Sequence, residues 1–404
     1  MSRKVGLGID VLTAAQERIA WTFDRFERIY VSFSGGKDST VMLHLVMDEA
    51  RKRSRKVGVL FVDLEAQYKL TIEHVEACYA LYRDSIEPHW VALPLALRNA
   101  VSQFEPKWLC WDPDARDRWV REPSPNSIQA ADHYPWFRTS MEFEELVPAF
   151  GQHYSGGKTT ACFVGIRSDE SLNRFRTLIM EKTRLEGKSW TTWCGGPLWN
   201  VYPIYDWGTA DLWTWHARRP EAPYNKLYDR MRLAGLTIHQ MRICQPYGDD
   251  QKKGLWLYQV IEPETWGRVV ARVNGANQGA LYASERGSIT GSHTIDKPDG
   301  HSWQSFAALL LESMPSATAD HYKDKISVFL RWWEDRGYPR GIPDEAPKDA
   351  EAARKQPSWR RICKSLLRND YWCKGLSFTQ TKSESFERYR KIMKKRRQQW
   401  GIFA

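Results

Sequence analysis

Between residues 10 and 93, apolar positions follow two spacings in turn. Some segments repeat apolar side chains every three to four residues, which is typical of helices. Others are short apolar runs rich in β-branched residues, which is typical of strands. Strands that alternate with helices predict a parallel sheet with right-handed crossovers, and therefore an α/β fold. The predicted helices are 10–27, 40–50 and 68–83, and the predicted strands are 28–33, 57–62 and 89–93.

The alternation stops at residues 105–140, which are rich in Trp, Pro, Asp and Arg. We interpret them as an insertion or functional loop. Beyond residue 220 the pattern changes to helices of mixed length separated by Gly and Pro, with a linker over 340–357 and a basic helix over 383–400. In between, the pattern predicts strands at 159–166 and 198–204 and helices at 169–182 and 209–218.

Composition narrows the class of protein. Of the 404 residues 42% are hydrophobic, which is enough for packed cores and excludes disorder as the main state. No apolar stretch is long enough for a membrane span, and residues 1–6 lead into a charged segment and not into an apolar signal region. Seven widely spaced cysteines without a CxxC pair argue against a disulfide framework, so we expect a reduced, cytoplasmic protein.

The balance of charge points to anionic partners. Lys and Arg total 59 and Asp and Glu total 49, a net charge of +10. Nucleotides and nucleic acids fit such a charge, although solubility alone also explains it.

The strongest candidate for chemistry is the turn between the first strand and the second helix. Its glycines permit a tight turn, and the backbone N–H groups of the turn and of the helix N-terminus then face an anion. The lysine adds positive charge, the serines add hydroxyl donors, and Asp38 is a candidate ligand of Mg²⁺. These features predict a nucleotide phosphate site. Its residues are Ser34, Gly35, Gly36, Lys37, Asp38 and Ser39.

This turn is not a P-loop of the GxxxxGK[ST] type, because that spacing is missing. A second glycine-rich string, 156–159, has a lysine and a threonine but precedes a predicted strand. We interpret that string as a connecting loop.

The string SGGKDS after a first strand resembles the pyrophosphate loop of the N-type ATP pyrophosphatases. Three further strings, 165–174, 202–213 and 223–228, resemble elements of the phosphoadenosine-phosphosulfate (PAPS) reductase family in the same superfamily. The resemblance implies an adenine-nucleotide alpha-hydrolase-like architecture that binds ATP with Mg²⁺. It also implies cleavage of ATP to AMP and pyrophosphate, and transfer of the adenylyl group to an acceptor.

Site residues follow from the motifs and from their places on the sheet. Arg167 and Asp63 each follow a predicted strand, at the edge where open α/β sheets bind ligands. The resemblance implies that this edge receives the adenosine. We expect Arg167 and Arg174 to hold the acceptor or the α-phosphate, although a solvated helix face also accounts for Arg174. The candidate catalytic residues are Lys37, Asp38, Arg167 and Arg174.

The chain departs from the family in its cysteines. PAPS reductases carry a terminal Glu-Cys-Gly-Ile/Leu-His string, whereas Cys363 and Cys373 lie in unrelated contexts. Adenylyl transfer to a sulfate-like or nucleic-acid acceptor, in sulfur or DNA-modification metabolism, is therefore the first hypothesis, and sulfonucleotide reduction is an alternative. Cys110, Cys194 and Cys244 are candidates for an iron–sulfur cluster by resemblance to nucleic-acid thiolases, but buried free cysteines are the preferred interpretation.

The C-terminal part resembles a domain of unknown function found in immunoglobulin-binding regulators, which are commonly encoded beside a ParB-like partner. That resemblance keeps open a regulator that senses a nucleotide and acts with such a partner on DNA, through the basic helix 383–400. We expect a nucleotide-binding domain at 1–222, the domain of unknown function, mainly helical, at 223–345 and a basic helical tail at 346–404.

Overall fold

The computed structural model describes most of the chain as two compact units. The described residues are 8–102, 104–170, 174, 183–238, 240–249, 254–276, 295 and 297–378. One unit, here the sheet unit, comprises residues up to Leu97 and Lys107–Val273. The other, the helical unit, comprises Arg98–Pro106 and the residues from Asn274.

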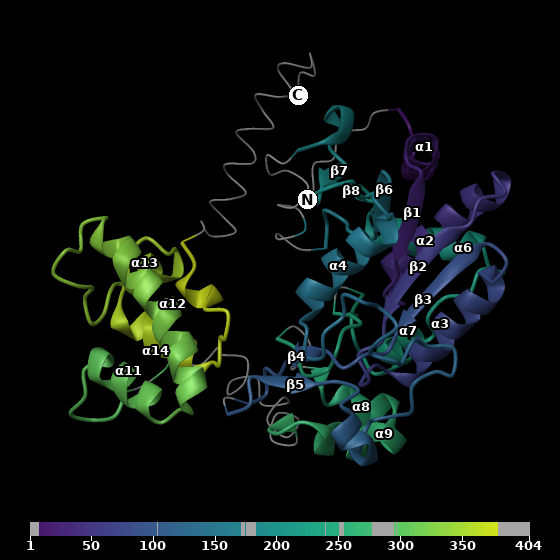
Figure 1. The fold of residues 1–404 in the computed structure, drawn as a ribbon. Coiled ribbons are helices and arrows are strands. Elements are labelled where there is room, and N and C mark those ends of the chain that lie inside the picture. The colour runs from purple at the N-terminus through teal and green to yellow at the C-terminus, as the bar shows by residue number, and fades with distance from the viewer. Residues whose placement is uncertain are drawn as a thin grey trace. The chain divides into compact units, whose positions relative to one another are not determined.

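A six-stranded sheet forms the centre of the described part of the sheet unit, in the order β3-β2-β1-β6-β8-β7 (Figure 1). All neighbours pair in parallel except β7, which is antiparallel to β8. A separate two-stranded sheet joins β4 and β5. The strands are β1 Arg28–Ser32, β2 Val57–Val62, β3 Ile86–Val91, β4 Ala96–Arg98, β5 Lys107–Leu109, β6 Thr160–Val164, β7 Thr191–Trp193 and β8 Leu198–Val201.

Helices cover both faces of the sheet, because successive residues of a strand point to opposite sides. Ile29 and Val31 face a core shared with α1, α2, α3 and α6. Tyr30 faces the other way and packs on Phe150 and Tyr154 of α4, with ring centroids 5.4 and 5.3 Å apart. The helices of this unit are α1 Val11–Arg25, α2 Lys37–Lys52, α3 Lys69–Tyr82, α4 Phe143–Ser155, α6 Thr209–Arg218, α7 Leu227–Leu233, α8 Leu257–Ile261 and α9 Pro263–Arg272, with the short 3₁₀ turns η1 Pro113–Arg118 and η2 Leu185–Gly187.

The helical unit has its own core, built on Tyr322, Phe329 and Ile362. Asn369 donates from Nδ2 to the Ser102 carbonyl at 2.9 Å, which fixes the 98–106 loop within this unit. The predicted linker 340–357 contains a helix and buries Ile342 and Ala346. The elements are α11 Trp303–Glu312, α12 Ser316–Glu334, α13 Lys348–Ala352, α14 Trp359–Leu367 and the 3₁₀ turn η4 Lys374–Leu376.

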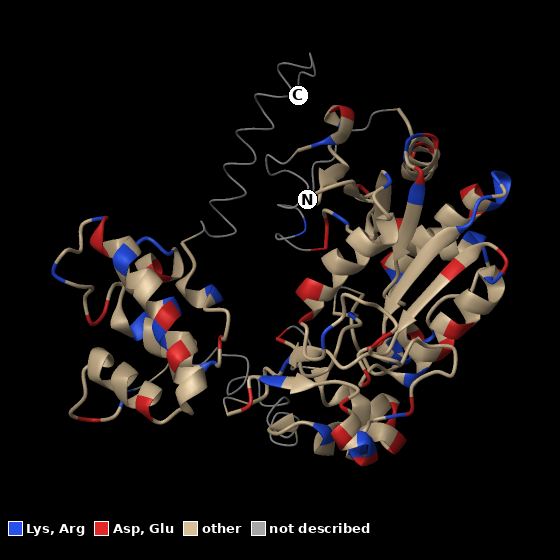
Figure 2. Ribbon diagram, viewed as in Figure 1, with Lys and Arg blue, Asp and Glu red and all other residues tan. Residues whose placement is uncertain are grey.

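The predicted α/β fold class with a helical C-terminal part is confirmed. The boundary expected at residue 222 falls inside the sheet unit, which extends to Val273. Its last helices pack back on this unit, because Tyr258 of α8 stacks on Tyr68 at the start of α3 with centroids 3.8 Å apart. No helix among the described residues has the length and apolar character that a membrane span needs. Basic and acidic residues are interspersed along the helices of both units (Figure 2).

Candidate functional site

The strand order reverses between β1 and β6, since the chain continues from β1 to β2 on one side and later adds β6 on the other. Crevices outside the carboxyl ends of parallel strands at such a reversal are the usual ligand sites of open α/β sheets. Two predicted site segments meet at this reversal. They are the loop 33–36 after β1 and the segment 165–167 after β6.

The loop after β1 has a conformation that glycine makes possible. Gly35 has φ +71°, and a Cβ atom there would lie 2.9 Å from Thr71 Cγ2. Gly36 occupies the N-cap of α2, and no side chain caps that end of the helix. Within the described residues, the N–H groups of Gly35 and Asp38 donate no hydrogen bond. This turn therefore offers unpaired donors at the positive end of a helix.

Inside the loop, Ser34 and Ser39 bond to each other with 2.9 Å between their Oγ atoms. Ser39 Oγ also donates to the Gly36 carbonyl at 3.1 Å. Their hydroxyls were expected to donate to an anion, but here they brace the turn. These two hydrogen bonds hold the conformation of the loop.

Two residues from the 223–228 string support the loop, and sequence reasoning assigned them no role. Asn225 donates from Nδ2 to the Gly35 carbonyl at 2.9 Å and to Thr71 Oγ1 at 3.1 Å. Tyr228 accepts from the Lys37 N–H at 3.0 Å, and burial raises its pKa, so the phenol stays protonated. Their place in a recognisable string was the available signal, but only the fold shows what they touch.

The charged residues of the site form one cluster. Arg167, only 2% exposed, donates from Nε to the Asp38 carboxylate, and Lys37 Nζ lies 3.3 Å from the same carboxylate. Lys37 Nζ also lies 5.4 Å from the centre of the Tyr228 ring. Gly165 makes the approach possible, because a Cβ there would be 3.1 Å from the Ser39 backbone. The structure thus brings together three of the four candidate catalytic residues.

Asp38, the expected magnesium ligand, is paired with two cationic side chains in this structure, Lys37 and Arg167. Nowhere in the described part of the chain do three His, Cys, Asp or Glu side chains gather closely enough to hold a metal ion. The magnesium role of Asp38 therefore stays a prediction, since a nucleotide-bound Mg²⁺ needs only one or two carboxylates beside the phosphates.

The fourth candidate, Arg174, reaches the cluster through Glu170, whose carboxyl also interacts electrostatically with Asp38, Lys37 and Arg167. Its guanidinium donates to Glu170, whose pKa is raised by burial. Most of the predicted helix 169–182 lies outside the described residues. A role for Arg174 toward the acceptor or the α-phosphate therefore stays a prediction.

Asp63 lies at the end of β2, as expected, but its carboxylate is fully buried and occupied. It accepts from Trp90 Nε1 at 3.0 Å and from the Arg121 guanidinium. Two residues on, Glu65 is also fully buried and accepts from Arg272 Nε at 2.6 Å. These ion pairs fasten the 105–140 insertion and α9 to the sheet edge.

Sequence reasoning missed Glu65, Arg121 and Arg272. The acid Glu65, two residues beyond a buried strand and its Asp63, was the only local signal. Asp63 pairs with Arg121 58 positions away, and Glu65 pairs with Arg272 207 positions away.

The three cysteines considered for a cluster are not brought together. Cys110 is buried, with Sγ 3.6 Å from the Leu93 carbonyl, Cys194 is exposed after β7, and Cys244 is half-buried. β7 is the edge strand farthest from the β3 side, where Cys110 lies. An iron–sulfur cluster on these residues is therefore not supported by the described part of the structure.

A mostly parallel sheet with a glycine-dependent loop between a strand and a helix at its reversal point is typical of nucleotide-binding folds of the pyrophosphate-loop type. The family model for the phosphoadenosine phosphosulfate reductase domain matches residues 28–108 and 117–249, and that for a domain of unknown function (DUF3440) matches 235–353 and 340–387. The chain belongs to the phosphoadenosine phosphosulfate reductase domain family.

Known relatives differ in how much of the chain they match. Uncharacterized protein YbdN of Escherichia coli (strain K12) is 46% identical over 405 residues, covering 99% of this chain and 98% of that protein. Sulfate adenylyltransferase subunit 2 of Streptomyces lavendulae is 26% identical over 206 residues, 48% of this chain and 54% of that protein. Among solved structures, PAPS reductase from Candida auris in a phosphate complex is 15% identical and has a TM-score of 0.32, over 54% of this chain and 84% of that one.

Proposed function

We propose that this protein binds ATP at the loop 33–39 and cleaves it between the α and β phosphates, transferring the adenylyl group to an acceptor. The observation that carries the proposal is the loop itself. Its unpaired N–H groups, at Gly35 and Asp38, lie beside the paired cations Lys37 and Arg167, at the reversal point of the sheet. Backbone donors and fixed positive charge are what a triphosphate requires.

In the reaction, a lone pair of the acceptor forms a bond to the α-phosphorus. The bond from that phosphorus to the α–β bridging oxygen breaks, and its electron pair leaves with pyrophosphate. Negative charge therefore grows on the leaving group. Lys37 and the helix N-terminus lie where they can stabilise that charge, and Asp38 holds Lys37 and Arg167 in place.

The alternative of sulfonucleotide reduction needs a reactive thiolate. Burial raises the pKa of Cys363 and of Cys373 to about 12 each, so both are protonated at neutral pH. These C-terminal thiols are poor nucleophiles, which favours adenylyl transfer. The alternative of a regulator acting through residues 383–400 concerns a segment outside the described residues and stays a prediction.

Product analysis with ATP labelled at the α or γ position tests the proposal, with sulfate, DNA and RNA offered as acceptors. We expect α-label in AMP or an adenylylated product and γ-label in pyrophosphate. Lys37→Ala removes a buried charge from the loop and is expected to lower cleavage at least tenfold. Lys52→Ala, at the exposed end of the same helix, is the matched control and should retain full activity.

Release of inorganic phosphate in place of pyrophosphate would contradict α–β cleavage. Tight ATP binding without cleavage under any condition would favour the nucleotide-sensing regulator.

A further inference from the structure

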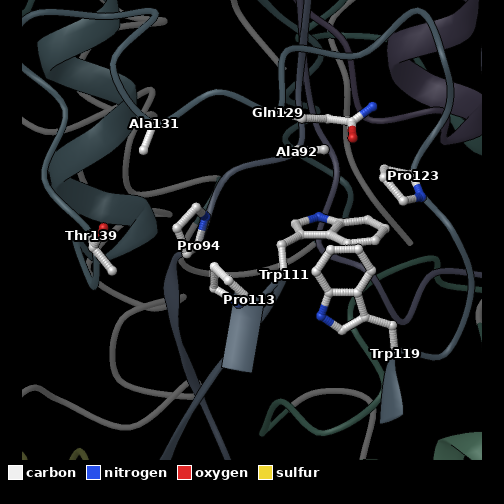
Figure 3. Close-up of a pocket in the computed structure, with 9 residues that line it drawn as sticks. All are labelled: Ala92, Pro94, Trp111, Pro113, Trp119, Pro123, Gln129, Ala131 and Thr139. Carbon is white, nitrogen blue, oxygen red and sulfur yellow. The ribbon is translucent and has the colours of Figure 1, made fainter. Parts of the chain in front are cut away.

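A cavity lies on the same edge of the sheet as the loop 33–39, beyond the end of β3. Its volume is about 280 Å³, and it lies entirely within the sheet unit. Pro94, just after β3, forms one wall, and the 105–140 insertion supplies most of the others (Figure 3). Only β2 separates β3 from β1, so at about 4.8 Å per strand these two strands lie about 10 Å apart.

Two indole rings dominate the cavity and both are locked. Trp111 Nε1 donates to the Asp63 carbonyl at 2.7 Å, and Trp119 Nε1 donates to the Asp112 carbonyl at 2.9 Å. The rings stand nearly perpendicular, at 89°, with centroids 5.2 Å apart. Both N–H groups are used by the backbone. Trp111 is only 3% exposed and has the Arg121 guanidinium 5.2 Å from its ring centre, so the half-buried Trp119 is the ring that a ligand can reach. Rigid aromatic faces bind planar rings at low entropic cost.

Backbone strain beside the cavity supports a functional role for it. Trp111 has φ +50° and Glu65 has φ +63°, both in the left-handed region that bulky residues avoid. The two are joined, since the Trp111 N–H donates to Glu65 Oε2 at 2.7 Å. Such strain costs about 1–3 kcal/mol per residue and is concentrated at ligand sites. The ion pair of Glu65 with Arg272 holds the arrangement in place.

One polar side chain at the cavity can form a hydrogen bond with the edge of a bound base. Gln129 is exposed and donates from Nε2 to the Ser124 carbonyl at 3.2 Å. Its Oε1 accepts no hydrogen bond from the described residues, so it can accept one from an amino group. Glutamine amides pair with amino-bearing base edges in this way. Adenine, cytosine and guanine carry such an amino group, whereas uracil does not.

We propose that this cavity binds the nucleobase of the acceptor, stacked on Trp119 with its amino group toward Gln129. The proposal rests on the adenylyl-transfer function above and names its second substrate as a nucleotide base. The base is either free or part of a nucleic acid, and the experiment separates these sources.

The test is calorimetric titration of the wild-type protein, without ATP, using nucleoside monophosphates and a single-stranded oligonucleotide. We expect binding of AMP, CMP or GMP to exceed binding of UMP. Preference for the oligonucleotide identifies nucleic acid as the source of the base, and equal affinity identifies the free nucleotide. Because a stacked base contributes about 1–3 kcal/mol, Trp119→Ala is expected to weaken binding five- to 150-fold. Gln129→Ala, at an exposed position, should abolish the discrimination against UMP.

Trp193→Ala is the matched control, since Trp193 is an exposed tryptophan on β7 whose Nε1 also donates to a backbone carbonyl. It should bind bases like the wild type. Equal losses in Trp119→Ala and Trp193→Ala, or no base binding by the wild type at millimolar concentration, would overturn the proposal. A parallel loss of ATP affinity in Trp119→Ala would also overturn it, because the cavity would then hold the adenine of ATP. Base binding that depends on Trp119 in a protein that never cleaves ATP would refute the transfer function and leave the base site standing.

Discussion

Single residues at this site owe their positions to partners far along the chain. Asp38 bonds to Arg167, and Glu65 bonds to Arg272, with all four side chains buried or nearly so. Burying a charge is costly unless it is paired. Each of these residues therefore stabilises the fold mainly because it keeps its partner from being a buried charge without a counter-charge. The pairs therefore specify which segments meet at the sheet edge.

Removing one member of such a pair should be severe. Arg272→Ala leaves Glu65 buried and charged, and we expect the free energy of unfolding to fall by about 3–5 kcal/mol. Arg268→Ala, at an exposed position on the same helix, should change it by less than about 0.5 kcal/mol. Urea denaturation of both variants measures the difference. Equal stability of the two variants would show that the Glu65 pair does not anchor α9.

Among the elements, the turn from β1 to α2 has the tightest requirements. Gly35→Ala places a Cβ in a left-handed residue and within 2.9 Å of Thr71, so it adds a clash to the backbone strain. We expect the free energy of unfolding to fall by about 1–3 kcal/mol and ATP binding to be lost. Gly157→Ala carries the same backbone strain, at φ +82°, but meets no atom within 4 Å.

Unfolding measurements and ATP titration on both variants separate strain from clash. Gly157→Ala should lose some stability but keep its ATP affinity. If Gly35→Ala binds ATP as tightly as Gly157→Ala, the loop is not the phosphate site.

Element prediction succeeded where the pattern was long and regular. The first three strands and their helices lie close to their expected positions, but the helix expected from residue 40 already begins at Lys37. Its first turn consists of the loop residues themselves, and polar residues at a helix start resemble a turn. β7 was missed because it has only three residues, and α4 was missed because Pro148 interrupts its helical pattern.

The molecule as a whole carries several buried histidines that must stay neutral. Burial lowers the pKa of His44, brings that of His74 to about 3 and brings those of His89 and His216 to about 4. A lowered folded pKa means that the unfolded chain binds more protons below pH 6.5. The contribution of these neutral histidines to the free energy of unfolding is therefore complete above pH 6.5. It is lost as the pH falls toward 4 for His89 and His216 and toward 3 for His74.

We expect the free energy of unfolding to decline between pH 6.5 and 4 by up to about 1.4 kcal/mol per pH unit for each such histidine. His216→Phe should reduce this slope, since neither ring nitrogen of His216 has a hydrogen-bond partner among the described residues. His133→Phe, at an exposed position, should leave the slope unchanged. Urea denaturation at a series of pH values measures it. A slope unaffected by His216→Phe would contradict the neutral state assigned to this residue.

The sequence by itself determined the parallel sheet and the glycine turn between its first strand and its second helix, because local spacing controls strands, helices and glycine turns. It also placed Asp63 and Arg167 at one sheet edge. Only the tertiary structure decided that Arg167 binds Asp38, that Glu65 binds Arg272, and that Trp111 and Trp119 wall a cavity beside β3. Those contacts join segments up to 207 residues apart. They are set by burial and charge pairing between distant segments, which the local spacing of residues does not predict.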